Sequence, residues 1–175
     1  MNGSAACCHD EAEAGANPAE ATIDSNRPSP MYLSMPFDHC ALWTNRSVDV
    51  DLQQWRILVV DDHAYSAEAL AAALAADGFD TRVALSGVDA LHAVDAWSPH
   101  IVILDITMLE HDGFATARVL RRIAQTRDAG IIAFTALGEE LVRKQGLSAG
   151  FDGYCQKGNP PAALVQLIQR LVHVH

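Results

Sequence analysis

RILVVDD, residues 56–62, is a short apolar run that ends in two aspartates. Its length and its β-branched residues are typical of a strand buried on both faces of a sheet. A stretch rich in alanine and leucine follows from Ser66 to Ala76 and stops at Asp77-Gly78, which predicts a helix with a glycine stop. A buried strand, a polar strand end and a helix together predict an α/β fold.

The same strand–helix unit recurs along the rest of the chain. The predicted strands are 56–60, 79–85, 100–104, 130–134 and 153–156. The predicted helices are 66–76, 86–97, 113–125, 139–149 and 160 to about 172, with Ser86, Asp112 and Asn159 as expected N-caps. Strict alternation of this kind implies a parallel sheet with helices on both faces, and right-handed crossovers leave few topologies.

Polar residues follow four of the five predicted strands. Asp61-Asp62 ends the first strand, Asp105 the third, Thr135 the fourth and Lys157 the fifth. Ligands of open parallel sheets bind outside the carboxyl ends of the strands. Three carboxylates at one edge repel each other, and a hard divalent cation such as Mg²⁺ relieves that repulsion. With a lysine and a hydroxyl nearby, the site suits a phosphoryl group for which an aspartate is the nucleophile.

These residues make the chain from 55 to 175 resemble a response-regulator receiver domain of two-component signalling, of the stand-alone, CheY-like type. The resemblance rests on Asp61-Asp62, Asp105, Thr135-Ala136 and Lys157, with Met108, Asp112-Gly113 and Tyr154 at further matching positions. It implies a flavodoxin-like, five-stranded, doubly wound parallel sheet of strand order 2-1-3-4-5 with five helices. It covers none of residues 1–54.

The resemblance implies a role for each acidic residue. Asp105 is the expected phospho-acceptor, which a histidine kinase or a histidine phosphotransfer protein would phosphorylate. Asp62, Asp105 and the backbone carbonyl of Thr107 are the expected ligands of Mg²⁺, and Asp61 is expected to assist through water. The domain would be a signalling module and not an enzyme, beyond its own phosphorylation and dephosphorylation.

The resemblance also implies a conformational switch. Lys157 is expected to pair with the phosphoryl oxygens, and Thr135 to move toward the phosphoryl group. Tyr154 would then turn into the space that Thr135 leaves. A local change in charge of this kind biases a two-state element, and an unknown target protein would recognise the altered surface.

Two positions depart from the family's pattern. Gly158 follows Lys157 where receivers usually have proline, and Leu109 follows Met108 where proline is also usual. A cis bond before a residue other than proline costs roughly 3 kcal/mol, so the Lys157–Gly158 bond could be cis or trans. Leu137, two residues beyond Thr135, cannot position a water by hydrogen bonding, and we expect slow loss of the phosphoryl group.

Two other classes of function remain open at this point. One is a receiver-like module that binds proteins without phosphorylation, which Gly158 and Leu109 favour. The other is a hydrolase with an aspartyl-phosphate intermediate. It is disfavoured because Thr107, and not a second acid, stands two residues after Asp105.

Residues 1–54 differ in character from the rest. They hold eight acidic residues and two arginines, a net charge of −6 within a total of −10. With four prolines up to residue 36 and no sustained period, they are expected to be a disordered extension. Phe37, Leu42, Trp43 and Trp55 could still dock on a folded neighbour, and Met31 or Met35 could be the true start.

Composition argues against nucleic acid and membrane partners, and it predicts the state of the thiols and a protein contact. An acidic chain argues against nucleic acid as a partner, and no apolar run reaches the ~20 residues that span a membrane. Cys7, Cys8, Cys40 and Cys155 are too few for a disulfide framework, so a cytoplasmic protein with reduced thiols is expected, with Cys155 packed as a buried apolar group. The last helix carries a wide apolar stripe, which predicts a homodimer or target contact there: Leu164, Val165, Leu167, Ile168, Leu171 and Val172.

Overall fold

The computed structural model describes residues 39–50, 54–109 and 112–174. The helices are α1 (Ala64–Ala76), α2 (Gly87–Ala96), α3 (Gly113–Leu120), α4 (Glu139–Ala149) and α5 (Pro161–Leu171). The strands are β1 (Cys40–Leu42), β2 (Val48–Val50), β3 (Arg56–Val60), β4 (Asp80–Ala84), β5 (Ile101–Leu104), β6 (Gly130–Thr135), β7 (Gly153–Gln156) and β8 (Val172–Val174).

The main sheet is mostly parallel and has six strands in the order β1-β7-β6-β5-β3-β4. Strands β3 to β7 are parallel to one another, and parallel strands are usually joined by a crossover helix. The α/β fold with five helices is confirmed. The predicted five-stranded sheet is wrong by one strand, because β1 adds an antiparallel edge beside β7. A separate pair of short strands, β2 and β8, is parallel.

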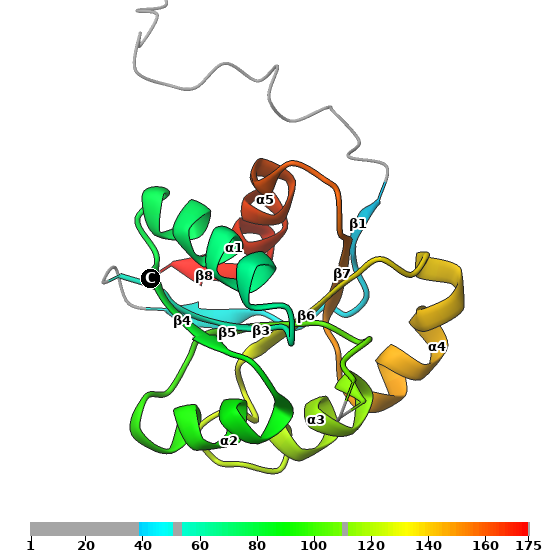
Figure 1. Cartoon of the computed structure of the whole chain (residues 1–175), viewed down its shortest axis with the longest axis horizontal. Helices are drawn as coiled ribbons and strands as arrows, with labels where there is room; N and C mark the ends of the chain where they lie inside the picture. The colour runs from blue at the N-terminus through cyan, green and yellow to red at the C-terminus, as the bar shows by residue number, and fades with distance from the viewer. Residues whose placement is uncertain (1–38, 51–53, 110–111, 175) are drawn as a thin grey trace, which may run out of the picture. The chain divides into compact units, whose positions relative to one another are not determined.

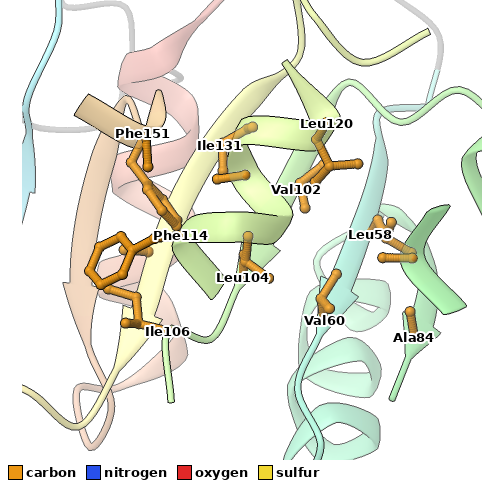
Figure 2. Close-up of a cluster of buried hydrophobic side chains, with 14 of the residues drawn as sticks. Leu58, Val60, Ala84, Val102, Leu104, Ile106, Phe114, Leu120, Ile131 and Phe151 are labelled. Carbon is orange, nitrogen blue, oxygen red and sulfur yellow. The ribbon is translucent and has the colours of Figure 1, made fainter. Parts of the chain in front are cut away.

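Helices cover both faces of the sheet. Figure 1 shows α1 and α5 on one face and α2 and α3 on the other, with α4 beside β7 and β1. One core cluster lies between the sheet and α2, α3 and α4, and it includes Leu58, Val102, Leu104 and Ile131 (Figure 2). A second cluster lies between the sheet and α1 and α5. The nearly continuous apolar strands are therefore explained by burial on both faces.

Strand β1 closes the edge of both core clusters. Cys40 and Leu42 pack with the α1–α5 cluster, whereas Ala41 and Trp43 pack with the opposite one. This alternation is the period of two that a strand imposes on its side chains. The expected disorder of the extension is therefore wrong for β1 and β2. Residues 1–38 and 51–53, including Phe37, lie outside the described residues.

The apolar stripe of the last helix is buried within the chain. Leu164, Leu167, Ile168 and Leu171 all belong to the α1–α5 core cluster, and Val165 is partly buried against it. Helix α5 also contacts β1. The stripe is wide because segments from the extension cover part of it, so it gives no support to the predicted homodimer through this helix.

A disulfide joins Cys40 to Cys155, which are directly opposite one another on β1 and β7. The expectation of reduced thiols is thus wrong for this pair, although Cys155 is fully buried as predicted. The sequence could not suggest the bond, because the two cysteines are separated by 115 residues and β1 itself was not predicted.

Three helix ends test the predicted caps. Ser86 and Asp112 accept hydrogen bonds from the backbone nitrogens of Asp89 and Phe114, as expected for N-caps. Helix α3 ends at Leu120 and not at 125, and the Leu120 carbonyl accepts from the Thr126 hydroxyl (2.7 Å) and from the Ile123 nitrogen (3.2 Å). The predicted Asn159 cap is wrong. Pro160 is the N-cap of α5, and the Asn159 amide donates instead to the Gln156 carbonyl (3.1 Å).

Candidate functional site

The carboxyl ends of the parallel strands bring the predicted site residues to one edge of the sheet. Asp61 follows β3, Asp105 follows β5, Thr135 ends β6 and Lys157 follows β7. The backbone ties two of these ends together, because the Lys157 nitrogen donates to the Thr135 carbonyl (2.8 Å). Asp61 and Asp105 are each 3% exposed, and Thr135 is fully buried.

Lys157 joins the two buried aspartates. Its Nζ donates to Asp61 Oδ2 and to Asp105 Oδ2, both at 2.7 Å. Burial lowers the pKa of Lys157, but the hydrogen bonds to Asp105 and Asp61 outweigh it, so the pKa lies above its usual value. The lysine is therefore held as a cation between the two carboxylates, where it partly cancels their repulsion.

Asp62 is more exposed than Asp61 and Asp105, and its partners come from other residues. The Leu109 nitrogen donates to Asp62 Oδ2 (2.8 Å), and His63 Nδ1 lies 2.9 Å from Asp62 Oδ1. Burial raises the pKa of Asp62, but the hydrogen bonds from Leu109 and His63 outweigh it, and the pKa lies below its usual value. Leu109 thus has a structural role through its backbone. The usual proline could not make this bond, because it has no N–H group to donate.

The second oxygen of Asp105 is bound by the residue two positions on. The nitrogen and the hydroxyl of Thr107 both donate to Asp105 Oδ1, at 3.0 and 3.2 Å. Helix α3 starts against the same turn: a Cβ at Gly113 would overlap the Asp105 carbonyl oxygen. The Asp112-Gly113 pair therefore caps α3 and also lets the helix approach the end of β5.

Thr135 and Tyr154 are connected through one residue. The Leu137 nitrogen donates to Thr135 Oγ1 (3.4 Å), and the Tyr154 hydroxyl donates to the Leu137 carbonyl (2.7 Å). Tyr154 is 1% exposed. Burial raises the pKa of Tyr154, and the negative charge of Glu139 raises it further. The phenol is thus held inward, below the surface between β7 and α4.

Sequence reasoning placed most of this site but missed one layer of it. The structure brings Asp61, Asp105 and Lys157 into direct contact. It connects Thr135 to Tyr154 by hydrogen bonds through a single intervening residue. It also stacks Trp43 on Tyr154, with ring centroids 5.7 Å apart. The available signal was the adjacent pair of large apolar residues Leu42 and Trp43 in the extension.

The site fits a divalent cation on the chemistry of its donors. Ligand atoms of Asp61, Asp62 and His63 lie within 4.8 Å of one another, and Asp105 adds a third carboxylate across Lys157. Carboxylate oxygens are the donors that Mg²⁺ prefers, and the low pKa of Asp62 keeps that group ionised. Beside Asp62, a cavity of about 370 Å³ reaches Ser86 and Met108.

Comparison with known families decides the membership of this chain. Residues 57–169 match the model of the response regulator receiver domain. The chain belongs to this receiver family. Receivers are signalling domains and not classical enzymes, they are partners of histidine kinases, and they generally bind Mg²⁺ at an acidic pocket.

The curated relatives that this receiver matches are longer proteins. It is 38% identical over 122 residues to the DNA-binding response regulator MtrA of Mycobacterium tuberculosis, covering 69% of this chain and 51% of the relative. It is 34% identical over 129 residues to the probable transcriptional regulator ycf27 of Guillardia theta, covering 73% and 50%. The chain thus spans about half the length of these relatives, which gives no support to the expected stand-alone type without nucleic acid.

Solved structures share the receiver fold. The chemotaxis protein CheY4 of Vibrio cholerae aligns with a TM-score of 0.66 at 23% identity, covering 68% of this chain and 99% of that one. The response regulator DrrB of Thermotoga maritima, an OmpR/PhoB homologue, aligns with a TM-score of 0.60 at 25% identity, covering 67% and 52%. In the described part of the receiver, no helix is both long and apolar enough to cross a membrane.

Proposed function

We propose that this receiver accepts a phosphoryl group on Asp105 from a phosphohistidine of a histidine kinase or a histidine phosphotransfer protein. The observation that carries the proposal is the bridge of Lys157 between Asp61 and Asp105 at the carboxyl edge of the sheet. A carboxylate oxygen of Asp105 attacks phosphorus, the phosphorus–nitrogen bond of the donor breaks, and the freed imidazole takes up a proton from solvent water. No further acid is needed from this chain.

Charge explains what each residue contributes. Asp61, Asp62, Asp105 and the Thr107 carbonyl would hold Mg²⁺, which neutralises charge on the transferring phosphoryl oxygens. Lys157 supplies a second positive charge and can exchange its bond to Asp105 for one to a phosphoryl oxygen. Thr135 offers a buried hydroxyl, and its link through Leu137 to Tyr154 offers a route from the acceptor to the surface beside α4.

Phosphorylation of the purified chain tests the proposal. Incubation with Mg²⁺ and acetyl phosphate should add one phosphoryl mass to the intact protein, and Asp105→Asn should abolish that gain. Asp89→Asn, which changes an exposed aspartate near the same edge, is the matched control and should leave it unchanged. An adduct that persists in Asp105→Asn would contradict the assignment.

The alternative is a receiver-like module that binds proteins without phosphorylation. Gly158 favours it, because this residue replaces the usual proline and has a φ of 101°, a conformation closed to proline. In that case no adduct forms with any phosphodonor. Steady release of phosphate at catalytic rates would instead indicate a hydrolase.

The life of the adduct gives an independent prediction. Leu137 is partly buried against the core, and its side chain offers no hydrogen bond to an attacking water. We therefore expect the phosphoryl group to be lost slowly from purified protein, and faster after Leu137→Gln, which restores a polar side chain. Loss within seconds from the unaltered chain, followed by intact mass, would contradict this expectation.

A further inference from the structure

A segment outside the family-matched region lies on the edge of the receiver, next to the residue expected to switch. Residues 40–46, here called the N-terminal clamp, begin with β1, which pairs with β7 in the register Cys40–Cys155, Ala41–Tyr154 and Leu42–Gly153. Beyond β1, the nitrogens of Trp43 and Thr44 donate to the Asp152 carbonyl at 2.7 and 3.2 Å. Backbone bonds thus attach the clamp to the receiver from Cys40 to Thr44.

Trp43 connects Tyr154 to helix α4. Trp43 is 8% exposed, and its ring stacks almost parallel on Tyr154, with an angle of 8° between the planes. Its Nε1 donates to Glu139 Oε1 (2.8 Å) in the first turn of α4. Further along α4, a Cβ at Gly146 would overlap the Trp43 ring. The helix therefore carries a glycine where the clamp needs room, and the two surfaces are complementary in shape and in hydrogen bonding.

The charged end of the clamp is also specific. Thr44 Oγ1 and Arg46 Nε both bond Asp152 Oδ1, each at 3.0 Å. The other oxygen of Asp152 accepts from the Ile131 nitrogen (3.0 Å) and from Arg121. Asp152 is buried and already pairs with Arg121, so the clamp adds a second cation and a hydroxyl to a carboxylate inside the receiver.

A chain of contacts connects the clamp to the site. The Leu137 nitrogen donates to the Thr135 hydroxyl, the Tyr154 hydroxyl donates to the Leu137 carbonyl, and Tyr154 stacks on Trp43. A movement of Tyr154 or of α4 must therefore break the stacking, the Glu139 hydrogen bond or the fit at Gly146. A disulfide from Cys40 to Cys155 holds the start of the clamp on β7 while this happens.

We propose that the N-terminal clamp is an intramolecular ligand of the β7–α4 surface, that phosphorylation of Asp105 favours its release, and that the Cys40–Cys155 bond permits release only after reduction. The proposal rests on the proposed function. A dithiol is the reductant: the bond between the two sulfurs breaks, each sulfur gains an electron and a proton, and the dithiol becomes a disulfide. Coupling between two sites is reciprocal, so release must in turn favour phosphorylation.

Hydrogen exchange of the full chain measures release directly. The amides of residues 40–46 are compared in oxidised protein and in protein reduced with dithiothreitol, each with and without Mg²⁺ and beryllofluoride. We expect slow exchange in both oxidised samples and an increase of about tenfold or more with beryllofluoride in the reduced one, the size of a typical coupling between sites. Unchanged exchange in β3 and β5 shows that the domain stays folded.

Gly146→Ala tests the coupling from the other side. The added methyl group displaces Trp43, so the reduced variant should exchange its clamp amides faster without beryllofluoride and should be phosphorylated several-fold faster by acetyl phosphate. Ser148→Ala, an exposed position on the same helix, is the matched control and should match the unaltered chain.

The outcomes separate the two proposals. If acetyl phosphate gives no adduct on Asp105, the proposed function fails and the clamp proposal fails with it. If the adduct forms but clamp exchange stays slow in reduced protein, the proposed function stands and the clamp is a permanent part of the fold. Fast clamp exchange in oxidised phosphorylated protein would overturn the role of the disulfide alone.

Discussion

At the scale of single residues, the site depends on one cation between two carboxylates. Lys157 contacts Asp61 and Asp105 at 2.7 Å, and both acids are almost fully buried. Removing one partner from such a group leaves a buried charge without compensation, which costs more than the pair itself contributes. The same acids are the expected ligands of Mg²⁺, so lysine and metal should substitute for each other in part.

Lys157→Ala should therefore destabilise the protein by about 3 kcal/mol without metal, because Asp61 and Asp105 lose their shared cation. Added Mg²⁺ should stabilise the variant more than it stabilises the unaltered chain. Urea unfolding with and without Mg²⁺ measures both effects. Lys144→Ala removes an exposed lysine and is the control, which should neither lose stability nor respond more strongly to Mg²⁺. Equal stabilities for the two variants would contradict this account.

Gly158 gives a second prediction at this scale. Its φ of 101° is left-handed, and a Cβ there would meet no atom within 4 Å, so the cost of substitution is purely conformational. Gly158→Ala should cost about 1–2 kcal/mol, and Gly158→Pro more, because proline holds φ near −65°. Gly138→Ala is the matched control, since Gly138 is equally open but has a φ of −66°. Urea midpoints that fall equally in both alanine variants would refute the argument.

At the scale of elements, Asp152 joins segments that are far apart in the chain. Its carboxylate lies just before β7 and binds the backbone of β6, Arg121 after α3, and Thr44 and Arg46 of the clamp. Burial lowers the pKa of Arg121, and the charge of Asp152 offsets part of that change. The elements are therefore held by a charged network as well as by apolar packing.

Asp152→Asn should lower the free energy of unfolding by about 3 kcal/mol, because Arg121 and Arg46 keep their charges and lose the opposite one. Asp128→Asn changes an exposed acid whose partner Arg127 is also exposed, and should have an effect below about 1 kcal/mol. Chemical unfolding of the two variants measures the difference. An equal loss of stability in both would show that Asp152 behaves as an ordinary surface ion pair.

At the scale of the whole molecule, the stability of the fold should depend on alkaline pH through Tyr154. Its pKa is raised by burial and by Glu139, so the folded state holds the phenol proton more tightly than the unfolded chain does. This contribution is fully present below the unfolded value of about 10 and is lost as pH rises through the higher folded value. The raised pKa of Lys157 acts in the same direction.

Tyr154→Phe removes one of these two contributions. Between about pH 8 and about pH 11, the unfolding free energy of the unaltered chain should fall more steeply than that of the variant. The Lys157 contribution is common to both and cancels in the difference. Equal slopes in urea unfolding would show that Tyr154 does not titrate as described.

The sequence was most informative where the chain repeats one unit. Strand–helix alternation predicted the five parallel strands, and the strand-end rule placed Asp61, Asp105 and Lys157 together. Trp43 could not be placed in the same way, since a three-residue strand has no measurable period and its partner is more than a hundred residues away. The prediction of Asn159 as an N-cap was wrong because two prolines follow it, and α5 begins at the second of them.

The link between Cys40 and Cys155 makes most of the receiver a covalent ring. Strands β3 to β6 and helices α1 to α4 lie within it, whereas α5 lies outside. A single cut by a protease inside the ring leaves two fragments that run as one species until the disulfide is reduced. In the chain-entropy account, a disulfide that closes a loop of about 100 residues lowers the entropy of the unfolded chain. This stabilises the folded state by about 4.7 kcal/mol. The folded protein should therefore survive heating longer in oxidising surroundings, which keep the disulfide, than in reducing ones.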